Sequence, residues 1–267
     1  MRGLWMLGWL AEAIAIVVMV AACGGGTALE RPVGEPSHPD LVPEPPDVLH
    51  TTVEDDGTNL IRFSSVLVNV GEGDFVLQGK RATDEHWMVT QVLHYTESGG
   101  EVVPTEARLT WGGDGHDHWH VARIATYDLA ELDDSGEVVE GDLGLTDTKV
   151  GFCFYDTHRV LDDVGPEEGV YEHEECGDED DQELGMGLSV GWSDTYDWSL
   201  PGQSIDITDL PDGRYRLSAR ADPNDWFDEV TRDNNDASTD FELTTREDGL
   251  RSAEVLRTQP ESSPSTG

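Results

Sequence analysis

The stretch Leu60-Ile61-Arg62-Phe63-Ser64-Ser65-Val66-Leu67-Val68-Asn69-Val70 is rich in branched and aromatic residues, which are typical of β-strands. It ends at Gly71-Glu72-Gly73-Asp74, a combination that favours a turn. No stretch of the chain has the apolar period of a long amphipathic helix. We therefore expect a strand over residues 60–70 in a mainly β protein.

Strand-like alternation returns nearer the C-terminus. Ile205-Asp206-Ile207 and Tyr215-Arg216-Leu217-Ser218-Ala219 flank the turn Leu210-Pro211-Asp212-Gly213. In this turn proline presets φ and glycine accepts a left-handed conformation, so we expect a hairpin here. Together these patterns predict one β-sandwich-like domain over residues 39–245, with long loops and few short helices.

Three histidines at alternate positions stand out in His116-Asp117-His118-Trp119-His120. Alternate residues of a β-strand point to one face, so a strand would direct all three imidazoles to one side. An ideal strand separates the outer two Cα atoms by about 13 Å, so the cluster needs a bend. Gly112, Gly113 and Gly115 permit one. Three imidazoles without a thiolate suit copper or zinc, and copper binds more tightly at equal geometry. The alternative is a solvated edge strand that happens to carry histidines.

The two ends of the chain differ from the middle. Residues 1–23 resemble a lipoprotein-type signal peptide, with Arg2 near the start and an apolar run that closes at Val20-Ala21-Ala22-Cys23. We expect Cys23 to be lipidated and the protein to be exported, as a membrane-anchored lipoprotein at the cell surface or in the periplasm. An uncleaved anchor and a plain secretory signal are the alternatives. Residues 24–38 predict a flexible tether, and residues 246–267 a disordered tail.

With Cys23 assigned to the lipid, Cys153 and Cys176 remain. An even pair of cysteines in an exported protein predicts a disulfide. A reactive thiol is the alternative.

Acidic residues dominate the charge, with 56 Asp and Glu against 16 Lys and Arg and a net charge of −40. Such a surface repels nucleic acid and attracts cationic partners, although it could equally be a solvated coat for a salty habitat. Lys80 and Lys149 are the only lysines. Lys149 precedes the apolar segment Val150-Gly151-Phe152-Cys153, where the ordinary alternative is a strand-edge lysine that reaches water.

Several segments of the expected domain, taken together, resemble the catalytic domain of the lysyl oxidase family. In chain order they are Pro39-Asp40-Leu41-Val42-Pro43, Ile61-Arg62-Phe63-Ser64-Ser65 with Asn69 and Asp74-Phe75, His116-Asp117-His118-Trp119-His120 with Tyr127-Asp128-Leu129, Lys149-Val150-Gly151-Phe152-Cys153 with Asp156-Thr157, Gly191-Trp192-Ser193-Asp194-Thr195-Tyr196, Ile205-Asp206-Ile207-Thr208-Asp209, and Asn234-Asn235. Each match is weak by itself, but their common order is specific.

The resemblance implies a copper site and a quinone cofactor. By position, His116, His118 and His120 would be the copper ligands, and Lys149 and Tyr196 would form the lysine tyrosylquinone of the family. The Lys149 amine must be neutral to add to the oxidised ring, so we expect burial and the nearby metal to lower its pKa. The quinone condenses with a primary amine, a base removes the α-proton, and hydrolysis releases an aldehyde. Oxygen then reoxidises the cofactor, which yields hydrogen peroxide and ammonia.

Two further groups follow from the same resemblance. Asp194 and Asp197 flank Tyr196 and are candidates for the base, with a solvent-facing position as the alternative. The calcium site of the family would have as its ligands Asp40, Leu41 (through its carbonyl), Glu229, Thr231, Asn234 and Asn235. Thr231 replaces an acid of the animal members, and a turn rich in Asn and Asp is the alternative reading of this segment.

Some positions depart from the family pattern. Gly113 stands where the family has an extra histidine, and Gly115, Trp192 and Gly202 replace cysteines of the animal enzymes. None of these changes removes an expected catalytic group.

We therefore expect a lysyl oxidase-type enzyme that oxidises primary amines, lysine in proteins included, with molecular oxygen. Its partners would be cationic amine substrates, without nucleic acid, and its only membrane contact would be an N-terminal lipid. The alternative is a non-catalytic copper-binding surface lipoprotein. The presence of both Lys149 and Tyr196 favours the enzyme, because a metal-binding protein needs neither.

Overall fold

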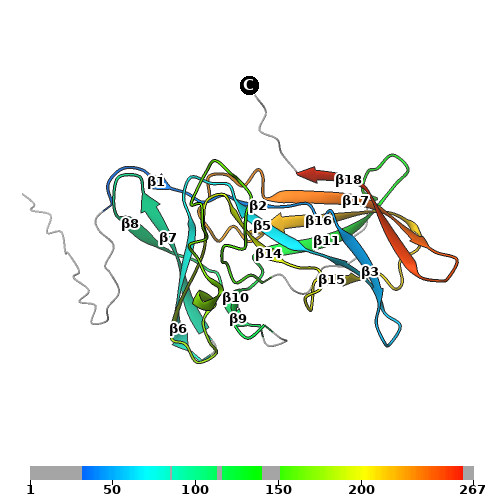
Figure 1. The fold of residues 1–267 in the computed structure, drawn as a ribbon, viewed down its shortest axis with the longest axis horizontal. Coiled ribbons are helices and arrows are strands. Elements are labelled where there is room, and N and C mark those ends of the chain that lie inside the picture. Colours follow the sequence, from blue (N-terminus) through cyan, green and yellow to red (C-terminus); the bar gives the residue numbers. More distant parts are fainter. Residues whose placement is uncertain (1–31, 85, 113–115, 140–150, 261–267) are drawn as a thin grey trace, which may run out of the picture.

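The structure is a computed structural model that describes residues 32–84, 86–112, 116–139 and 151–260. Within these ranges the chain consists of strands and loops, apart from the short 3-10 helix η1 (His173–Cys176). The expected mainly β class with few short helices is thus confirmed. The described part of the chain contains no helix that is long and apolar enough to cross a membrane. The molecule is elongated, with sheets following one another along its long axis (Figure 1).

One layer of the fold is a four-stranded antiparallel sheet in the order β11-β16-β17-β18. Its strands are β11 (Ala125–Leu132), β16 (Gly213–Ala221), β17 (Asp236–Thr245) and β18 (Arg251–Pro260). Alternate residues of β16, Tyr215, Leu217 and Ala219, are buried. This two-residue period directs one face of the sheet to the core.

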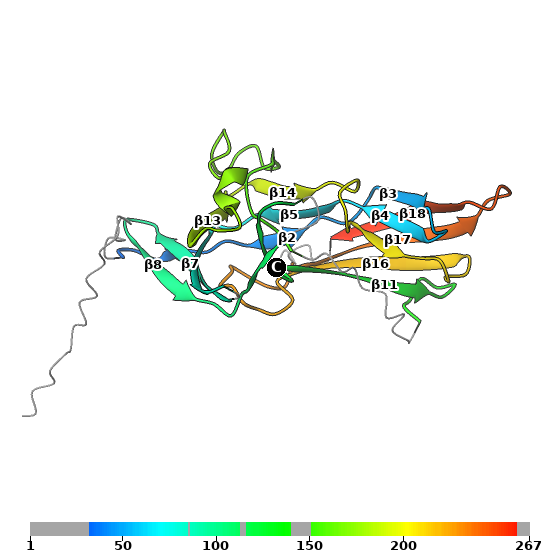
Figure 2. The same cartoon turned by 90° about the horizontal axis from the view of Figure 1, so that it is seen from below.

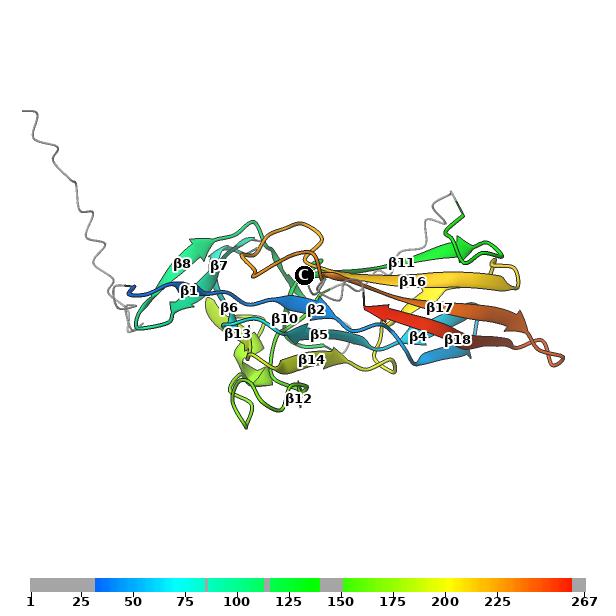
Figure 3. The ribbon, with the colours of Figure 1, turned by 90° about the horizontal axis from the view of Figure 1, so that it is seen from above.

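The opposing layer consists of two smaller antiparallel sheets. The first has the order β12-β14-β5-β2, with β12 (His158–Arg159), β14 (Trp192–Tyr196), β5 (Ser65–Asn69) and β2 (Leu41–Pro43). The second has the order β15-β4-β3, with β15 (Ser204–Asp206), β4 (Asn59–Phe63) and β3 (Leu49–Val53). Figures 2 and 3 show these strands stacked against the layer of β11 and β16.

The two layers meet through buried aromatic side chains. Phe63 of β4 packs on Tyr127 of β11, with 4.9 Å between the ring centroids, and both are fully buried. At one edge, the Thr51 hydroxyl of β3 donates a hydrogen bond of 2.7 Å to the carbonyl of Arg251 in β18. These contacts form a sandwich, in which removal of aromatic area from water supplies the main stabilisation.

A fourth sheet lies at one end of the molecule and has the order β1-β7-β6-β13, with β8 also paired to β7 (Figure 1). Its strands are β1 (Pro36–Ser37), β6 (Phe75–Thr83), β7 (His86–Tyr95), β8 (Gly100–Pro104) and β13 (Glu183–Leu188). A separate pair, β9 (Leu109–Trp111) and β10 (Trp119–Val121), follows along the chain.

Two expectations for individual strands are wrong. Residues 60–70 form two strands instead of one, because the chain changes sheets at Ser64, whose hydroxyl accepts a hydrogen bond from the Trp198 amide. The expected hairpin is also absent, since β15 pairs with β4 while β16 pairs with β11 and β17.

The expected ends of the domain need correction as well. Residues 251–260 of the expected tail form β18, and residues 36–37 of the expected tether form β1. The expected signal peptide, residues 1–23, lies outside the described residues.

Candidate metal centre

The three histidines lie at the end of the strand pair β9–β10. In this pair Thr110 is opposite His120. The amide of Gly112 donates a hydrogen bond of 3.0 Å to the carbonyl of His118, which closes the loop before β10. A Cβ atom at Gly112 would lie 2.3 Å from the carbonyl oxygen of His116 and 2.7 Å from the His120 ring. Only glycine at position 112 therefore allows the chain to approach the cluster this closely.

His116, His118 and His120 each offer one imidazole nitrogen as a possible ligand, and these three nitrogens lie within 4.8 Å of one another. All three side chains are buried, and so are their Nε2 atoms. The expectation that one strand carries all three is wrong, because only His120 belongs to β10 and the other two precede it in the loop. Leaving the strand is what brings the outer histidine close, since an extended chain would keep it too distant. Gly113 and Gly115 lie outside the described residues.

The donor atoms of this cluster are suited to a transition metal. The cluster contains three imidazole nitrogens and neither a thiolate nor a carboxylate. Imidazole binds copper and zinc well, and a buried cluster of three leaves room for a further ligand. The residues thus fit the metal that the sequence resemblance implies.

Tyr196 lies against the cluster. Its ring is nearly parallel to that of His116, at 9° with 5.8 Å between centroids, and its centroid is 5.9 Å from that of His120. The phenol oxygen accepts a hydrogen bond of 3.0 Å from the Cys153 amide. Burial, and then the nearby Asp194, raise the pKa of Tyr196 well above its usual value. Tyr196 is therefore a neutral phenol fixed beside the histidines.

Lys149 lies outside the described residues, which resume at Gly151. From there the chain runs along β10, because the amides and carbonyls of Phe152 and Val121 pair with each other. A Cβ atom at Gly151 would lie 3.1 Å from the Cβ atom of His120. The segment that follows Lys149 is thus in contact with the metal centre.

The expected disulfide between Cys153 and Cys176 is present, with its Cα atoms 5.8 Å apart. Both cysteines are fully buried. The bond connects η1 to the residue whose amide holds the Tyr196 phenol.

The two candidates for the base lie in different surroundings. Asp194 is on the same face of β14 as Tyr196 and is fully buried. Burial raises the pKa of Asp194 well above its usual value, although the Thr195 amide lowers it, and Asp156 raises it further. Asp197 is exposed, and hydrogen bonds from Ser199 lower its pKa. Of the two, only Asp194 has a raised pKa, and it lies on the same strand face as the tyrosine.

His173 is a residue of the centre that sequence reasoning missed. Its Nε2 atom lies 3.1 Å from the Nδ1 atom of His118, and the two rings meet edge to face at 85°. It opens η1, three residues before Cys176. The one signal in the sequence was a histidine close to a cysteine that we expected to be bonded.

The expected calcium ligands also come together, mostly at the junction of β2 and the loop before β17. Glu229 accepts hydrogen bonds from the Leu41 amide at 2.7 Å and from Asn235 at 3.1 Å, and Asn234 donates to Asp40 at 3.0 Å. Burial raises the pKa of Glu229 to about 7.

One oxygen each of Asp40, Asn234 and Asn235 is buried without a hydrogen-bond partner among the described residues. Carboxylate and amide oxygens are the ligands that Ca²⁺ prefers, so these atoms fit the ion. The Thr231 hydroxyl instead accepts a hydrogen bond of 3.1 Å from the Asp233 amide.

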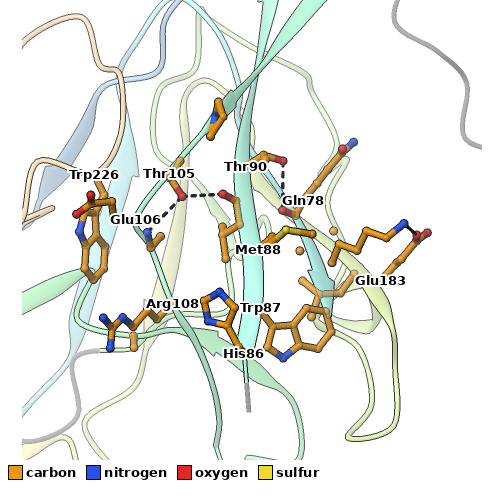
Figure 4. Close-up of a pocket in the computed structure, with 18 of the residues that line it drawn as sticks. Gln78, His86, Trp87, Met88, Thr90, Thr105, Glu106, Arg108, Glu183 and Trp226 are labelled. Carbon is orange, nitrogen blue, oxygen red and sulfur yellow. Dashed lines mark hydrogen bonds and ion pairs between the residues drawn. The ribbon is translucent and has the colours of Figure 1, made fainter. Parts of the chain in front are cut away.

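A separate hollow of about 1420 Å³ lies over β6, β7 and β13 (Figure 4). Met88, Arg108 and Trp226 are among its lining residues. None of the three histidines lines it, but Trp87 of its lining packs edge to face on Trp119, with 5.0 Å between the ring centroids.

The fold and the centre define a class: a β-sandwich protein in which a buried imidazole cluster, suited to a transition metal, faces a buried tyrosine. Residues 96–251 match the family model described as lysyl oxidase, which is more than half of the chain. The chain therefore belongs to the lysyl oxidase family.

Named relatives agree with this assignment. The chain is 29% identical over 178 residues to lysyl oxidase homolog 2 of Gallus gallus, a match that covers 66% of the chain and 17% of the relative. It is 30% identical over 166 residues to lysyl oxidase homolog 2A of Danio rerio, which covers 62% and 17%. Protein-lysine 6-oxidase of Gallus gallus is 29% identical over 146 residues, which covers 54% and 30%. The chain thus spans less than a third of the length of each of these relatives.

Proposed function

We propose that this protein is a copper- and quinone-dependent amine oxidase that deaminates primary amines, lysine side chains of proteins in particular. The overall reaction consumes one amine, one dioxygen and one water, and it yields one aldehyde, one ammonia and one hydrogen peroxide. The observation that carries the proposal is the Tyr196 ring, stacked on His116 with its phenol oxygen held by the Cys153 amide. A protein that only binds metal has no need of a buried tyrosine in this position.

The cofactors are proposed on the basis of family and donor chemistry. His116, His118 and His120 would hold copper, and Lys149 and Tyr196 would form lysine tyrosylquinone. Copper and quinone together would supply the electron sink and the route to dioxygen that the side chains lack. Lys149 precedes Gly151 by two residues, and two residues of extended chain span about 7 Å. The lysine is therefore tethered to a segment that contacts His120.

The protein itself must position the amine and move its protons. Asp194 is the proposed base for the α-proton, because it shares a strand face with Tyr196 and burial raises its pKa, as is typical of groups that transfer protons. The net charge of −40 would draw cationic substrates to the protein through long-range electrostatics.

The first test is chemical. Copper-loaded, aerated protein should give a branched tryptic peptide that joins the Lys149 and Tyr196 segments, a visible quinone absorption, and peroxide on addition of primary amines. Zinc-loaded protein should give none of these, because zinc has no redox chemistry. Separate, unmodified peptides together with no peroxide from any amine would favour the copper-binding lipoprotein instead.

Matched variants separate the tyrosine from the metal. Tyr196→Phe should remove the cross-link, the colour and peroxide formation, while copper binding stays close to wild type. Tyr95→Phe, in β7 of the end sheet, is the control and should keep all four. Replacing all three histidines of the cluster by alanine should abolish stoichiometric copper binding.

We further propose that Cys23 is lipidated and holds the protein at the outer side of a membrane. The support is the apolar run that ends in Val20-Ala21-Ala22-Cys23. Cys23→Ala should move the protein from the membrane fraction to the soluble fraction. An unchanged distribution would favour an uncleaved anchor.

We also propose that Asp40, the Leu41 carbonyl, Glu229, Asn234 and Asn235 bind Ca²⁺, with Thr231 a weaker sixth ligand. The support is the group of buried oxygens described above. Calcium should raise the melting temperature, and Glu229→Gln should abolish that increase. Glu247→Gln, at an exposed position, is the control and should respond like wild type.

A further inference from the structure

His173 makes a specific contact with one ligand of the metal centre. Its Nε2 atom lies 3.1 Å from His118 Nδ1, which is hydrogen-bonding distance, and 4.5 Å separates the ring centroids. His118 is buried, whereas His173 is exposed. The contact joins residues 55 positions apart in the chain.

The chemistry of imidazole decides what this contact can do. A neutral imidazole carries one N–H and one lone pair, and a metal requires the lone pair. Nδ1 of His118 faces His173, and its Nε2 atom is buried, so Nε2 is the nitrogen of His118 that would bind a metal. Its Nδ1 must then carry the proton and donate it to Nε2 of His173. The bond thus selects one tautomer of His118 and one orientation of its ring.

His173 is itself held in place from two sides. Its ring packs edge to face on Tyr155, with 5.2 Å between the centroids. The helix η1 that it opens ends at Cys176, whose disulfide partner Cys153 donates its amide hydrogen to the Tyr196 phenol. The disulfide therefore ties the segment that contacts His118 to the residue that holds Tyr196.

A fourth ligand is the competing role for His173. That role would require a nitrogen of His173 directed at the ion, beside the Nε2 atoms of the cluster. Instead its Nε2 faces Nδ1 of His118, on the outer edge of that ring. The geometry therefore favours a positioning residue over a ligand.

We propose that His173 is a positioning residue, which fixes His118 as the Nδ1–H tautomer and thereby strengthens metal binding by the cluster. This inference rests on the part of the proposed function that assigns the metal to His116, His118 and His120. It does not depend on the quinone or on amine oxidation.

The test compares His173→Ala, His173→Gln and the control His94→Ala, which replaces an exposed histidine of β7. Copper and zinc affinities are measured by competition with a chelator. His173→Ala should weaken binding about 10- to 100-fold, as for other residues that orient metal ligands. His173→Gln should recover most of the loss, because its amide oxygen can accept the Nδ1 hydrogen. His94→Ala should bind like wild type.

A second measurement detects the tautomer itself. In metal-free protein labelled with ¹⁵N-histidine, His118 should be the Nδ1–H tautomer in wild type and a mixture of both in His173→Ala. Unchanged metal affinity in His173→Ala, or an unchanged His118 tautomer, would overturn the inference. Equal losses in the Ala and Gln variants with unchanged tautomers would indicate a merely structural role and would also overturn it.

The outcomes separate this inference from the proposed function. Wild-type protein that binds copper but never oxidises an amine would end the oxidase proposal, while the affinities of the variants would still decide the role of His173. Full oxidase activity together with unaltered metal binding in His173→Ala would overturn only the role of His173. A wild-type protein that binds neither metal would overturn both.

Discussion

Two buried aspartates, one in each layer of the sandwich, have very different surroundings. Asp240 of β17 accepts hydrogen bonds from Arg216 at 2.7 Å and from Arg257 at 2.6 Å. Burial alone would raise the pKa of Asp240, but these arginines lower it below its usual value. Asp194 of β14 is fully buried and belongs to no ion pair among the described residues, and burial raises its pKa well above the usual value.

This difference is the one expected between a structural carboxylate and a carboxylate that transfers protons. A buried aspartate between two guanidinium groups stays ionised and ties strands together, since those bonds compensate its desolvation. A buried aspartate without a cation is harder to ionise, which costs stability whenever it must carry a charge. Raised pKa values beside a metal centre are typical of groups that transfer protons.

The largest expected effect is on catalysis by Asp194. Asp194→Asn should lower the rate of amine-dependent peroxide release by about 100- to 10,000-fold, because the amide cannot accept the α-proton. Copper content should stay at the wild-type level, since Asp194 is no part of the histidine cluster. A steady-state peroxide assay on quinone-containing protein measures this. A variant with the wild-type rate would remove Asp194 from the mechanism.

The next largest effect should come from removal of the disulfide, which should loosen only the part of the molecule around the metal centre. Cys153→Ser with Cys176→Ser should lower the free energy of unfolding by about 3 kcal/mol, the entropy of a loop of this size. The loss should appear in denaturant unfolding of oxidised protein, with wild type under reducing conditions as the comparison. Hydrogen exchange should increase in η1 and β14 but not in β17. Equal loosening of β17 would contradict a local role.

Much of the metal centre could be predicted from the sequence because its residues are close in the chain or few in type. Alternate spacing identified His116, His118 and His120, and an even count identified Cys153 with Cys176. The contact of His173 with His118 could not be predicted, because only the tertiary fold brings two such distant loops together.

The sheet was harder to predict where neither face of a strand is fully buried. Residues 251–259 of β18 alternate only weakly between half-buried and exposed, so the two-residue period that reveals a strand is missing.

The prediction of a hairpin around residues 210–213 was wrong for a different reason. Asp212 of the expected turn accepts hydrogen bonds from the amide and hydroxyl of Thr245, a long-range tie that local turn chemistry does not encode.

Removal of the Asp240 carboxylate should lower stability moderately and leave metal binding unchanged. Asp240→Asn should lower the free energy of unfolding by about 2 kcal/mol, through lost charge-assisted hydrogen bonds to Arg216 and Arg257. We expect no more than this because Arg257 is half exposed and water screens part of the interaction. Chemical denaturation measures the loss, and copper affinity should not change. The control is Asp248→Asn at an exposed position. It should lower the free energy of unfolding by less than about 0.5 kcal/mol, as is usual for surface substitutions.

The last prediction concerns pH: the contributions of Asp240 and Asp194 to stability should change in opposite directions as the pH falls. The lowered pKa of Asp240 means that it stabilises the fold above pH 3.8, its unfolded value, and that this contribution is lost as pH falls through its folded pKa. The raised pKa of Asp194 means the opposite, since its contribution is complete below pH 3.8 and is lost as pH rises towards its folded pKa. The stability of wild type minus that of Asp240→Asn should therefore decrease on acidification. The stability of wild type minus that of Asp194→Asn should increase on acidification, by at most about 1.4 kcal/mol for each pH unit. Denaturant unfolding of metal-free protein over a pH series measures both differences, and the subtraction cancels the acid titration shared by the rest of this highly charged chain. Two differences of the same sign would mean that both aspartates are held in the same charge state, and the contrast between the two regions would fail.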